Sequence, residues 1–233
     1  MPYLQQERGL FKKILVANRG EIALRVMRTC REMGIATVAV YSTVDRNMLH
    51  VRYADEAYHI GEGPPLESYL NYKKIVEVAK AAGVDAIHPG YGFLSARTEF
   101  AEACAGAGIT FIGPNPESVK LLGDKVSARR TMIAAGVPVV PGTEDRVGPD
   151  EALKLAPGIG FPMLIKAAAG GGGKGIRLVK TPEEIEGAVR VASSEAQSAF
   201  GDGGVLLERF LSPVRHIEIQ ILGDTHGNLV HLF

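Results

Sequence analysis

The 233-residue chain has 26 lysines and arginines and 26 aspartates and glutamates, so its formal net charge at pH 7 is zero. This balance provides no electrostatic footprint for a nucleic acid or an anionic membrane, so any bound phosphate must be held by local groups. The chain is 46% hydrophobic and 22% charged, as in ordinary soluble globular proteins, and is long enough for one large domain or two modest ones.

The beginning of the chain does not have the pattern expected of a membrane anchor or a signal peptide. Only the short run from Ile14 to Ala17 is apolar there, far below the roughly 20 residues of a membrane span and unlike a signal peptide. We therefore expect a cytoplasmic location, or the mitochondrial matrix in a eukaryote. Cys30 and Cys104 lie in apolar helical patterns without nearby metal ligands, and we interpret both as core thiols.

The first third of the chain alternates short apolar runs with amphipathic stretches. Three predicted helices end at Gly34, Gly83 and Gly108, and each is followed by an apolar run, as at helix C-caps before buried parallel strands. The pattern predicts an α/β fold with a doubly wound parallel sheet over residues 1–114. Its predicted strands are KILVA, IATVAVY, AIH and TFIG, and its predicted helices are EIALRVMRTCREMG, KKIVEVAKAAG and EFAEACAGAG.

The rest of the chain changes character after residue 114. Residues 115–137 have helical spacing broken at Gly123, which predicts a helical connector. Residues 138–210 combine a helix near 149–156, strand-like runs, a glycine tract and a helix after Thr181, which predicts a small α+β module. Residues 211–233 predict a hairpin, and because an isolated hairpin is only marginally stable, we expect the chain to be cut from a longer protein.

The glycine tract is the strongest single chemical feature. Lys166 stands at the end of one strand-like run, and Ala169 is followed by four glycines, Lys174 and Gly175 before the next run. Glycines let backbone N–H groups close on phosphate oxygens, and the two lysines supply cations. The alternative is a flexible surface hairpin. A Walker A loop is excluded, because the G-x-x-x-x-G-K-[ST] pattern is absent.

Two further motifs follow strands in the first domain. The turn from Asn18 to Ala23 opens a helix, but it lacks the G-x-G-x-x-G spacing of a dinucleotide site. The loop HPGYGFLS, residues 88–95, follows the strand AIH at the carboxyl edge of the sheet, where ligand crevices open. This loop fits a substrate contact or a structural turn that packs Tyr91 and Phe93, and both interpretations stay open.

Two candidates lie near the second domain's borders. Glu208 ends a strand-like run, and its carboxylate could accept from the amine of a purine whose edge meets the neighbouring backbone. A solvated charge at a strand end is the simpler alternative. Lys125, beside the break at Gly123, could reach a phosphate or lie on a helix surface.

The motifs FKKILVANRGEIALRVMRTCRE, HPGYGFLS, FIGP, GDKVSAR, GVPVVPG, GFPMLIKAAAGGGGKGIRLV, LLERFL and RHIEIQILGD, in this order, closely resemble the biotin carboxylase component of biotin-dependent carboxylases. The resemblance covers essentially the whole chain. It implies a pre-ATP-grasp domain, then an ATP-grasp lid domain at 138–210, then the start of the ATP-grasp sheet at 211–233. It also implies a ligase that uses ATP, Mg²⁺ and bicarbonate to carboxylate biotin on a carrier protein.

The resemblance also implies roles for particular residues and partners. Lys125 and Lys166 would contact the phosphates, Gly172 and Gly173 would lie in the lid loop, Glu208, Arg209 and Leu211 would frame the adenine, and His216 would approach the ribose. The magnesium carboxylates, the general base and the biotin site would lie beyond residue 233. The implied partners are a biotin carboxyl carrier protein and a carboxyltransferase component, with Arg28 and Glu32 at a homodimer contact.

Three alternatives accompany this interpretation. The variant A-G-G-G-G-K-G is similar to the propionyl-CoA type, but the acceptor could be acetyl-CoA, propionyl-CoA or pyruvate, because a separate component chooses it. The parent could be another ATP-grasp ligase, such as a carbamoyl-phosphate or purine-pathway enzyme. The 233 residues alone could bind nucleotide without turnover, because they lack the magnesium carboxylates that would stabilise charge in the transition state.

Overall fold

The computed structural model describes residues 11–168, 176–200 and 203–233. The chain divides into two compact units, one ending at Gly123 and one beginning at Asp124. The predicted connector over 115–137 is therefore divided between them, with α5 (Pro116–Gly123) in the first unit and α6 (Lys125–Ala134) in the second.

The first unit contains the predicted parallel sheet. Its strands are β1 (Lys13–Val16), β2 (Ala36–Ser42), β3 (Glu56–Gly61), β4 (Ala86–His88) and β5 (Thr110–Phe111), in the order β3-β2-β1-β4-β5. Every neighbouring pair is parallel, as in Leu15 opposite Val38 and Ile87. The strand order reverses between β1 and β4, which makes the fold doubly wound. The fold class predicted for this part of the chain is confirmed.

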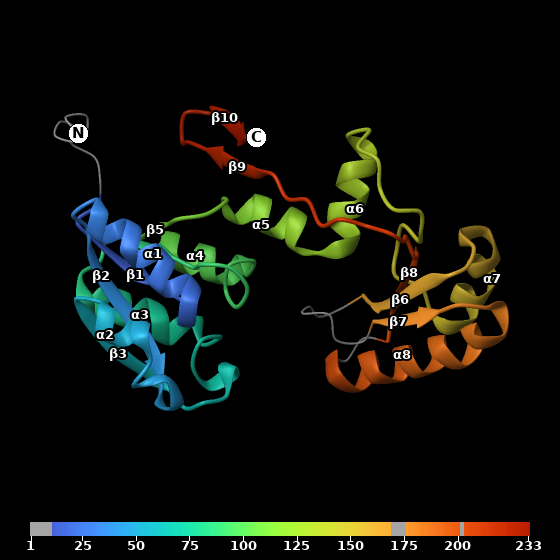
Figure 1. The fold of residues 1–233 in the computed structure, drawn as a ribbon, viewed down its shortest axis with the longest axis horizontal. Helices are drawn as coiled ribbons and strands as arrows, with labels where there is room; N and C mark the ends of the chain where they lie inside the picture. Colours follow the sequence, from blue (N-terminus) through green and yellow to red (C-terminus); the bar gives the residue numbers. More distant parts are fainter. Residues whose placement is uncertain (1–10, 169–175, 201–202) are drawn as a thin grey trace. The chain divides into compact units, whose positions relative to one another are not determined.

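Successive side chains along each strand point to opposite faces of the sheet, and helices cover both faces. Ile14 and Val16 pack against α1 (Gly20–Glu32), whose Ala23, Met27 and Cys30 are buried. Leu15 faces the other way, into a larger core with α3 (Tyr72–Ala82) and α4 (Thr98–Gly106), whose centre includes Phe100. Figure 1 shows these helices around the sheet. Both cysteines are buried and free, as predicted.

Two elements of this unit are missing from the sequence prediction. The edge strand β3 and the short helix α2 (Leu49–Tyr53) lie between β2 and α3. In β3 only Ile60 is buried, so the strand lacks the continuous apolar run that marks a central parallel strand. Helix α2 has five residues, too few to show helical periodicity.

The second unit contains a small antiparallel sheet covered by two helices. Strand β6 (Met163–Ala167) lies between β7 (Arg177–Val179) and β8 (Val205–Arg209). Helices α7 (Pro149–Ile159) and α8 (Ile185–Phe200) pack on one face, where Met163, Ile165 and Leu207 are fully buried (Figure 1). The predicted small α+β arrangement is present in this unit.

The last part of the chain forms a hairpin of β9 (Gln220–Gly223) and β10 (Leu229–Leu232), closed by hydrogen bonds to the Asp224 carboxylate. The strand predicted across RHIEIQILGD is present only in its second half. Every residue from 211 to 233 is exposed. No helix within the described ranges is long and apolar enough to cross a membrane.

Candidate nucleotide site

Lys166 and Glu208 meet on the face of the small sheet opposite α7 and α8. The register pairs Leu164 with Glu208 and Lys166 with Leu206, so the two charged residues stand diagonally on one face. Their side chains form an ion pair and are each about one quarter exposed, at 24% and 22%. A cation and a carboxylate on a partly sheltered sheet face can serve a ligand that carries both phosphate and amine groups.

Helix α6 places a second lysine against the same face. Asp124 is the N-cap, and its carboxylate accepts from the Ser127 backbone N–H at 2.8 Å. That bond, more than any other cause, holds the pKa of Asp124 below its ordinary value. The first helical residue is then Lys125, whose Nζ donates to the Ala167 carbonyl at 3.3 Å, while Val126 packs on Ala168 and Leu206.

Lys125 therefore lies at the first position of the helix, where a positive charge slightly destabilises it. The first turn of a helix carries a partial positive charge, so a lysine there costs a few tenths of a kcal/mol, while an acid would be stabilising. Residues that violate a local rule in this way are found most often at functional positions. The placement favours a role for Lys125 in binding an anion over that of an ordinary surface lysine.

An additional segment, residues 141–147, makes backbone hydrogen bonds to the edge of β8 that does not pair with β6. Thr143 and Val147 donate backbone hydrogen bonds to Leu207 and Val205, both at 2.9 Å, and the Arg209 N–H donates to Pro141 at 2.8 Å. The segment approaches so closely that a Cβ on Gly142 would lie 2.3 Å from the Leu207 carbonyl oxygen. This close approach fixes the backbone of Glu208 from both sides.

The remaining predicted site residues are placed differently. The Arg209 side chain points to the end of α7, where Nη1 donates to the Ile159 carbonyl at 3.1 Å, so only its backbone stands beside Glu208 on the strand. Leu211 is 46% exposed. His216 lies in an exposed segment, with Nε2 3.0 Å from the Glu218 carboxylate. Gly172, Gly173 and Lys174 lie outside the described residues.

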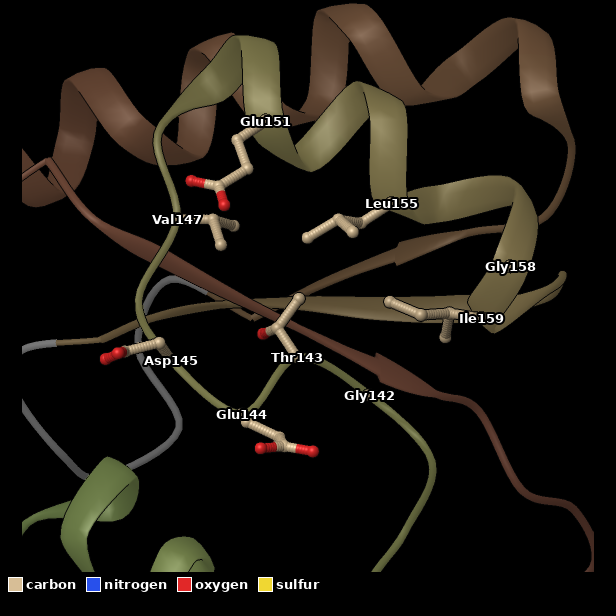
Figure 2. Close-up of a pocket in the computed structure, with 9 residues that line it drawn as sticks. All are labelled: Gly142, Thr143, Glu144, Asp145, Val147, Glu151, Leu155, Gly158 and Ile159. Carbon is tan, nitrogen blue, oxygen red and sulfur yellow. The ribbon is translucent and has the colours of Figure 1, made fainter.

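A hollow of about 400 Å³ lies elsewhere in the second unit, between segment 142–147 and α7. Figure 2 shows Val147, Leu155 and Ile159 around it, with the carboxylates of Glu144 and Asp145 turned away from α7. Lys166 and Glu208 are not among its lining residues, and none of the lining residues is cationic. The hollow therefore lacks the groups that a polyphosphate needs, and the Lys166 face is the better candidate for a nucleotide site.

The carboxyl edge of the first unit's sheet carries a second polar arrangement. Asp45 is buried and accepts from Arg19 at 2.5 Å, from Ser42 at 3.0 Å and from the Tyr69 hydroxyl at 2.7 Å. Burial would raise the pKa of Asp45, but these three bonds outweigh burial and hold the pKa below its ordinary value. Burial and the bond to Asp45 raise the pKa of Tyr69 to about 12. No sequence pattern indicates this arrangement, because Asp45 and Tyr69 lie outside the periodic segments.

A magnesium site would need several oxygen ligands. Within 11–168, 176–200 and 203–233, no three His, Cys, Asp or Glu side chains gather closely enough to hold a metal ion. The described part of the chain thus brings two lysines and one carboxylate to one sheet face, but it does not offer a protein cage for Mg²⁺.

Comparison with known proteins agrees with this geometry. The family described as "Biotin carboxylase, N-terminal domain" matches residues 10–119, and "Carbamoyl-phosphate synthase L chain, ATP binding domain" matches residues 124–233. The chain is 56% identical to a biotin carboxylase of Nostoc over 95% of its length and 55% identical to mouse mitochondrial pyruvate carboxylase. It spans 50% of the first relative's length and 19% of the second's.

Solved structures give the same result. The biotin carboxylase domain of Hydrogenobacter thermophilus 2-oxoglutarate carboxylase, a dimer in complex with MgADP and bicarbonate, matches 96% of this chain with a TM-score of 0.88 and 49% identity, over 49% of that domain. Campylobacter jejuni biotin carboxylase matches 95% with a TM-score of 0.87 and 48% identity, over 50% of its length. The chain therefore carries a biotin carboxylase N-terminal domain followed by an ATP-grasp ATP-binding domain, and it is homologous to biotin carboxylases and pyruvate carboxylases over about 95% of its length.

Proposed function

We propose that this chain is the N-terminal part of a biotin carboxylase, which uses ATP and bicarbonate to carboxylate biotin on a carrier protein for an acyl-CoA or pyruvate carboxylase. The observation that carries the proposal is the convergence of Lys125, Lys166 and Glu208 on one face of the small sheet. The Hydrogenobacter relative, whose structure holds MgADP and bicarbonate, supports it.

In this proposal, the residues of the sheet face divide the nucleotide between them. Lys125 and Lys166 neutralise phosphate oxygens, and Gly172 and Gly173, which lie outside the described residues, would belong to the lid loop that the resemblance implies. Glu208, with the backbone of Arg209 and Leu211, holds the adenine, and His216 approaches the ribose. Mg²⁺, when bound, would supply positive charge that offsets the negative charge developing during phosphoryl transfer. The chain's own contribution is to position the nucleotide and supply positive charge.

The proposal is tested on the full-length protein that contains this chain. We expect ATP cleavage that depends on bicarbonate and increases when free biotin is added. The same assay on residues 1–233 alone should show no turnover. Absence of biotin stimulation in the full-length protein would contradict the proposed function.

Another ATP-grasp ligase is the second candidate, because the second half of the chain matches the carbamoyl-phosphate synthase ATP-binding family. The match of residues 10–119 to the biotin carboxylase N-terminal domain favours the first. The assay separates the two, since a carbamoyl-phosphate enzyme would need a nitrogen donor and ignore biotin. A nucleotide-binding module without turnover remains our proposal for the 233 residues by themselves.

We also propose the partners that this reaction needs, a biotin carboxyl carrier protein or domain and a carboxyltransferase component. A homodimer is a further proposal, because the Hydrogenobacter relative is described as a dimer. Arg28 and Glu32 are both exposed one turn apart on α1, available for such a contact. Sedimentation of the Arg28→Glu variant of the full-length protein, with Arg25→Glu as the control, would show whether the dimer dissociates.

A further inference from the structure

Two sequence motifs that the proposed nucleotide site leaves unused are joined by one buried side chain. Asn18 follows β1, is 2% exposed, and donates both hydrogens of its carboxamide to the loop after β4. Nδ2 lies 2.8 Å from the Pro89 carbonyl oxygen and 2.8 Å from the Tyr91 carbonyl oxygen, and Oδ1 accepts from the Arg19 N–H at 2.9 Å. The turn at Asn18 and loop 89–93 thus form one unit.

The chemistry of the contact specifies asparagine. Two carbonyl oxygens converge on Nδ2, so an oxygen at that position would be left without a donor, and the amide orientation follows from the bonds. The loop also fits the carboxamide closely, because a Cβ on Gly90 would lie 2.7 Å from Nδ2. Gly90 has φ +65°, so glycine is required there for conformation as well as for space.

One residue of loop 89–93 holds an unfavourable backbone conformation. Gly92 also has φ +65°, and Phe93, which is not a glycine, has φ +44°. A bulky residue in this region is strained, and such strain persists only where the surroundings determine it. Phe93 is held by stacking on Tyr69 at 5.3 Å, and Tyr69 is held by the Asp45 arrangement described above. The loop is therefore fixed at both ends, by Asn18 and by Tyr69.

The tip of this fixed loop remains open. Tyr91 is 62% exposed, and its hydroxyl donates to Glu21 on α1 at 2.5 Å. The tip lies at the carboxyl edge of the sheet, after β4 and beside β1, where the strand order reverses and doubly wound sheets bind ligands. A strained residue held by the core beside such an edge is an observation from which a functional role of the loop can be inferred.

We propose that Asn18 is a positioning residue, whose carboxamide holds loop 89–93 in the strained conformation that turnover requires. The inference rests on the proposed function, because it assigns the loop a part in that reaction. We expect its effect on kcat rather than on KM for ATP, because the hydrogen bonds of the Asn18 carboxamide go to Pro89, Tyr91 and Arg19, which are not among the residues proposed to hold ATP.

The effect of Asn18 on the stability of loop 89–93 can be measured in this chain without an assay of enzymatic activity. Chymotrypsin cleaves after exposed tyrosines in segments that can unfold locally, so Tyr91 reports the loop. We expect Asn18→Ala to increase the rate of cleavage after Tyr91 by about tenfold or more, because two carbonyls lose their donor. Thr37→Val is the matched control, since it removes a buried hydroxyl that bonds to Asp55 at 2.9 Å rather than to the loop. It should leave cleavage after Tyr91 unchanged.

The same variants in the full-length enzyme test the catalytic part. We expect Asn18→Ala to lower kcat by about tenfold to a hundredfold, as small misplacements do, while KM for ATP stays within about twofold of wild type. Gly90→Ala disturbs the contact from the loop side and should have the same effect, which keeps the test valid if Asn18→Ala fails to fold. Thr37→Val should leave both constants unchanged.

The outcomes separate the two proposals. Wild-type cleavage rates after Tyr91 in both loop variants, or unchanged kcat in both, would overturn the role of Asn18. A kcat loss matched by Thr37→Val would also overturn it, because it would reflect stability alone. If the wild-type full-length protein shows no bicarbonate-dependent ATP cleavage, the proposed function fails, whereas the proteolysis result still decides whether Asn18 holds the loop.

Discussion

Lys166 and Glu208 show what a single pair of side chains contributes to the proposed site. Their mutual ion pair is partly exposed, so its own contribution to stability is small, about 0–1 kcal/mol. In the proposed function, Lys166 exchanges its carboxylate partner for phosphate oxygens when nucleotide binds. We therefore expect the loss of its side chain to affect binding and to leave folding nearly unaffected.

We expect Lys166→Ala in the full-length enzyme to raise KM for ATP at least about tenfold, because a charge-assisted bond to phosphate contributes about 1.5–3 kcal/mol. Steady-state ATP cleavage as a function of ATP concentration measures it. Lys154→Ala, which removes an exposed lysine on α7, is the control and should behave as wild type. An ATP dependence unchanged by Lys166→Ala would remove this residue from the site.

The sequence marks these residues as candidates but does not predict that they pair with each other. Lys166 and Glu208 are separate candidates in the sequence, and the antiparallel register that places them on one face is a property of the folded sheet. Asn18 and loop 89–93 are also separate motifs. Their contact depends on β1 lying beside β4, which follows from the strand order rather than from either motif.

At the scale of single elements, α6 connects local capping chemistry to the site. The carboxylate of Asp124 begins the helix and thereby places Lys125 and Val126 on the sheet. Capping residues contribute typically about 1 kcal/mol, mainly by satisfying backbone N–H groups that have no other partner. The stability of this helix should therefore follow the ionisation of Asp124.

We expect Asp124→Ala to lower the free energy of unfolding by about 1 kcal/mol near neutral pH. The folded pKa of Asp124 lies below its ordinary value of 3.8, so this contribution is complete above that value and is lost as the pH falls through the folded pKa. Urea unfolding of wild type and variant should therefore differ near pH 7 and converge under acid. The control Asp150→Ala removes an 85% exposed carboxylate and should cost under about 0.5 kcal/mol. A difference that grows under acid would contradict the assignment.

The sequence predicts those helices that bury one face and those strands that are buried on both faces. The central strands β1, β2 and β4 are continuous apolar runs, and the helices α1 and α3 are clearly amphipathic, so the sequence predicts them. In the edge strand β3, partly buried residues mostly alternate with exposed ones, so no apolar run marks the strand. The strand predicted over 215–224 is limited to the residues that pair with β10. Pairing is long-range information that a local pattern does not contain.

At the scale of the whole molecule, each unit has a hydrophobic core of its own. The first is centred on residues such as Phe100 and Ile87, and the second on Met163, Ile165 and Leu207. The sequence predicts a change of architecture after the first sheet, and the structure places the division between Gly123 and Asp124. Because each unit has its own core, each can unfold separately. We therefore do not expect the whole chain to unfold in a single two-state transition.

The distribution of tyrosine makes this testable in the chain itself. There is no tryptophan, and all 7 tyrosines precede residue 92, so tyrosine fluorescence reports the first unit, whereas far-UV circular dichroism reports both. We expect Phe100→Ala, which empties a fully buried site, to shift the fluorescence transition in urea by about 3–5 kcal/mol. Leu207→Ala, equally buried in the second unit, should shift part of the dichroism transition by about 2–5 kcal/mol and leave tyrosine fluorescence unchanged. If Leu207→Ala also moves the tyrosine transition, or Phe100→Ala moves the whole dichroism transition rather than the part that belongs to the first unit, the two units unfold as one, and the division of the chain into separate cores has no energetic meaning.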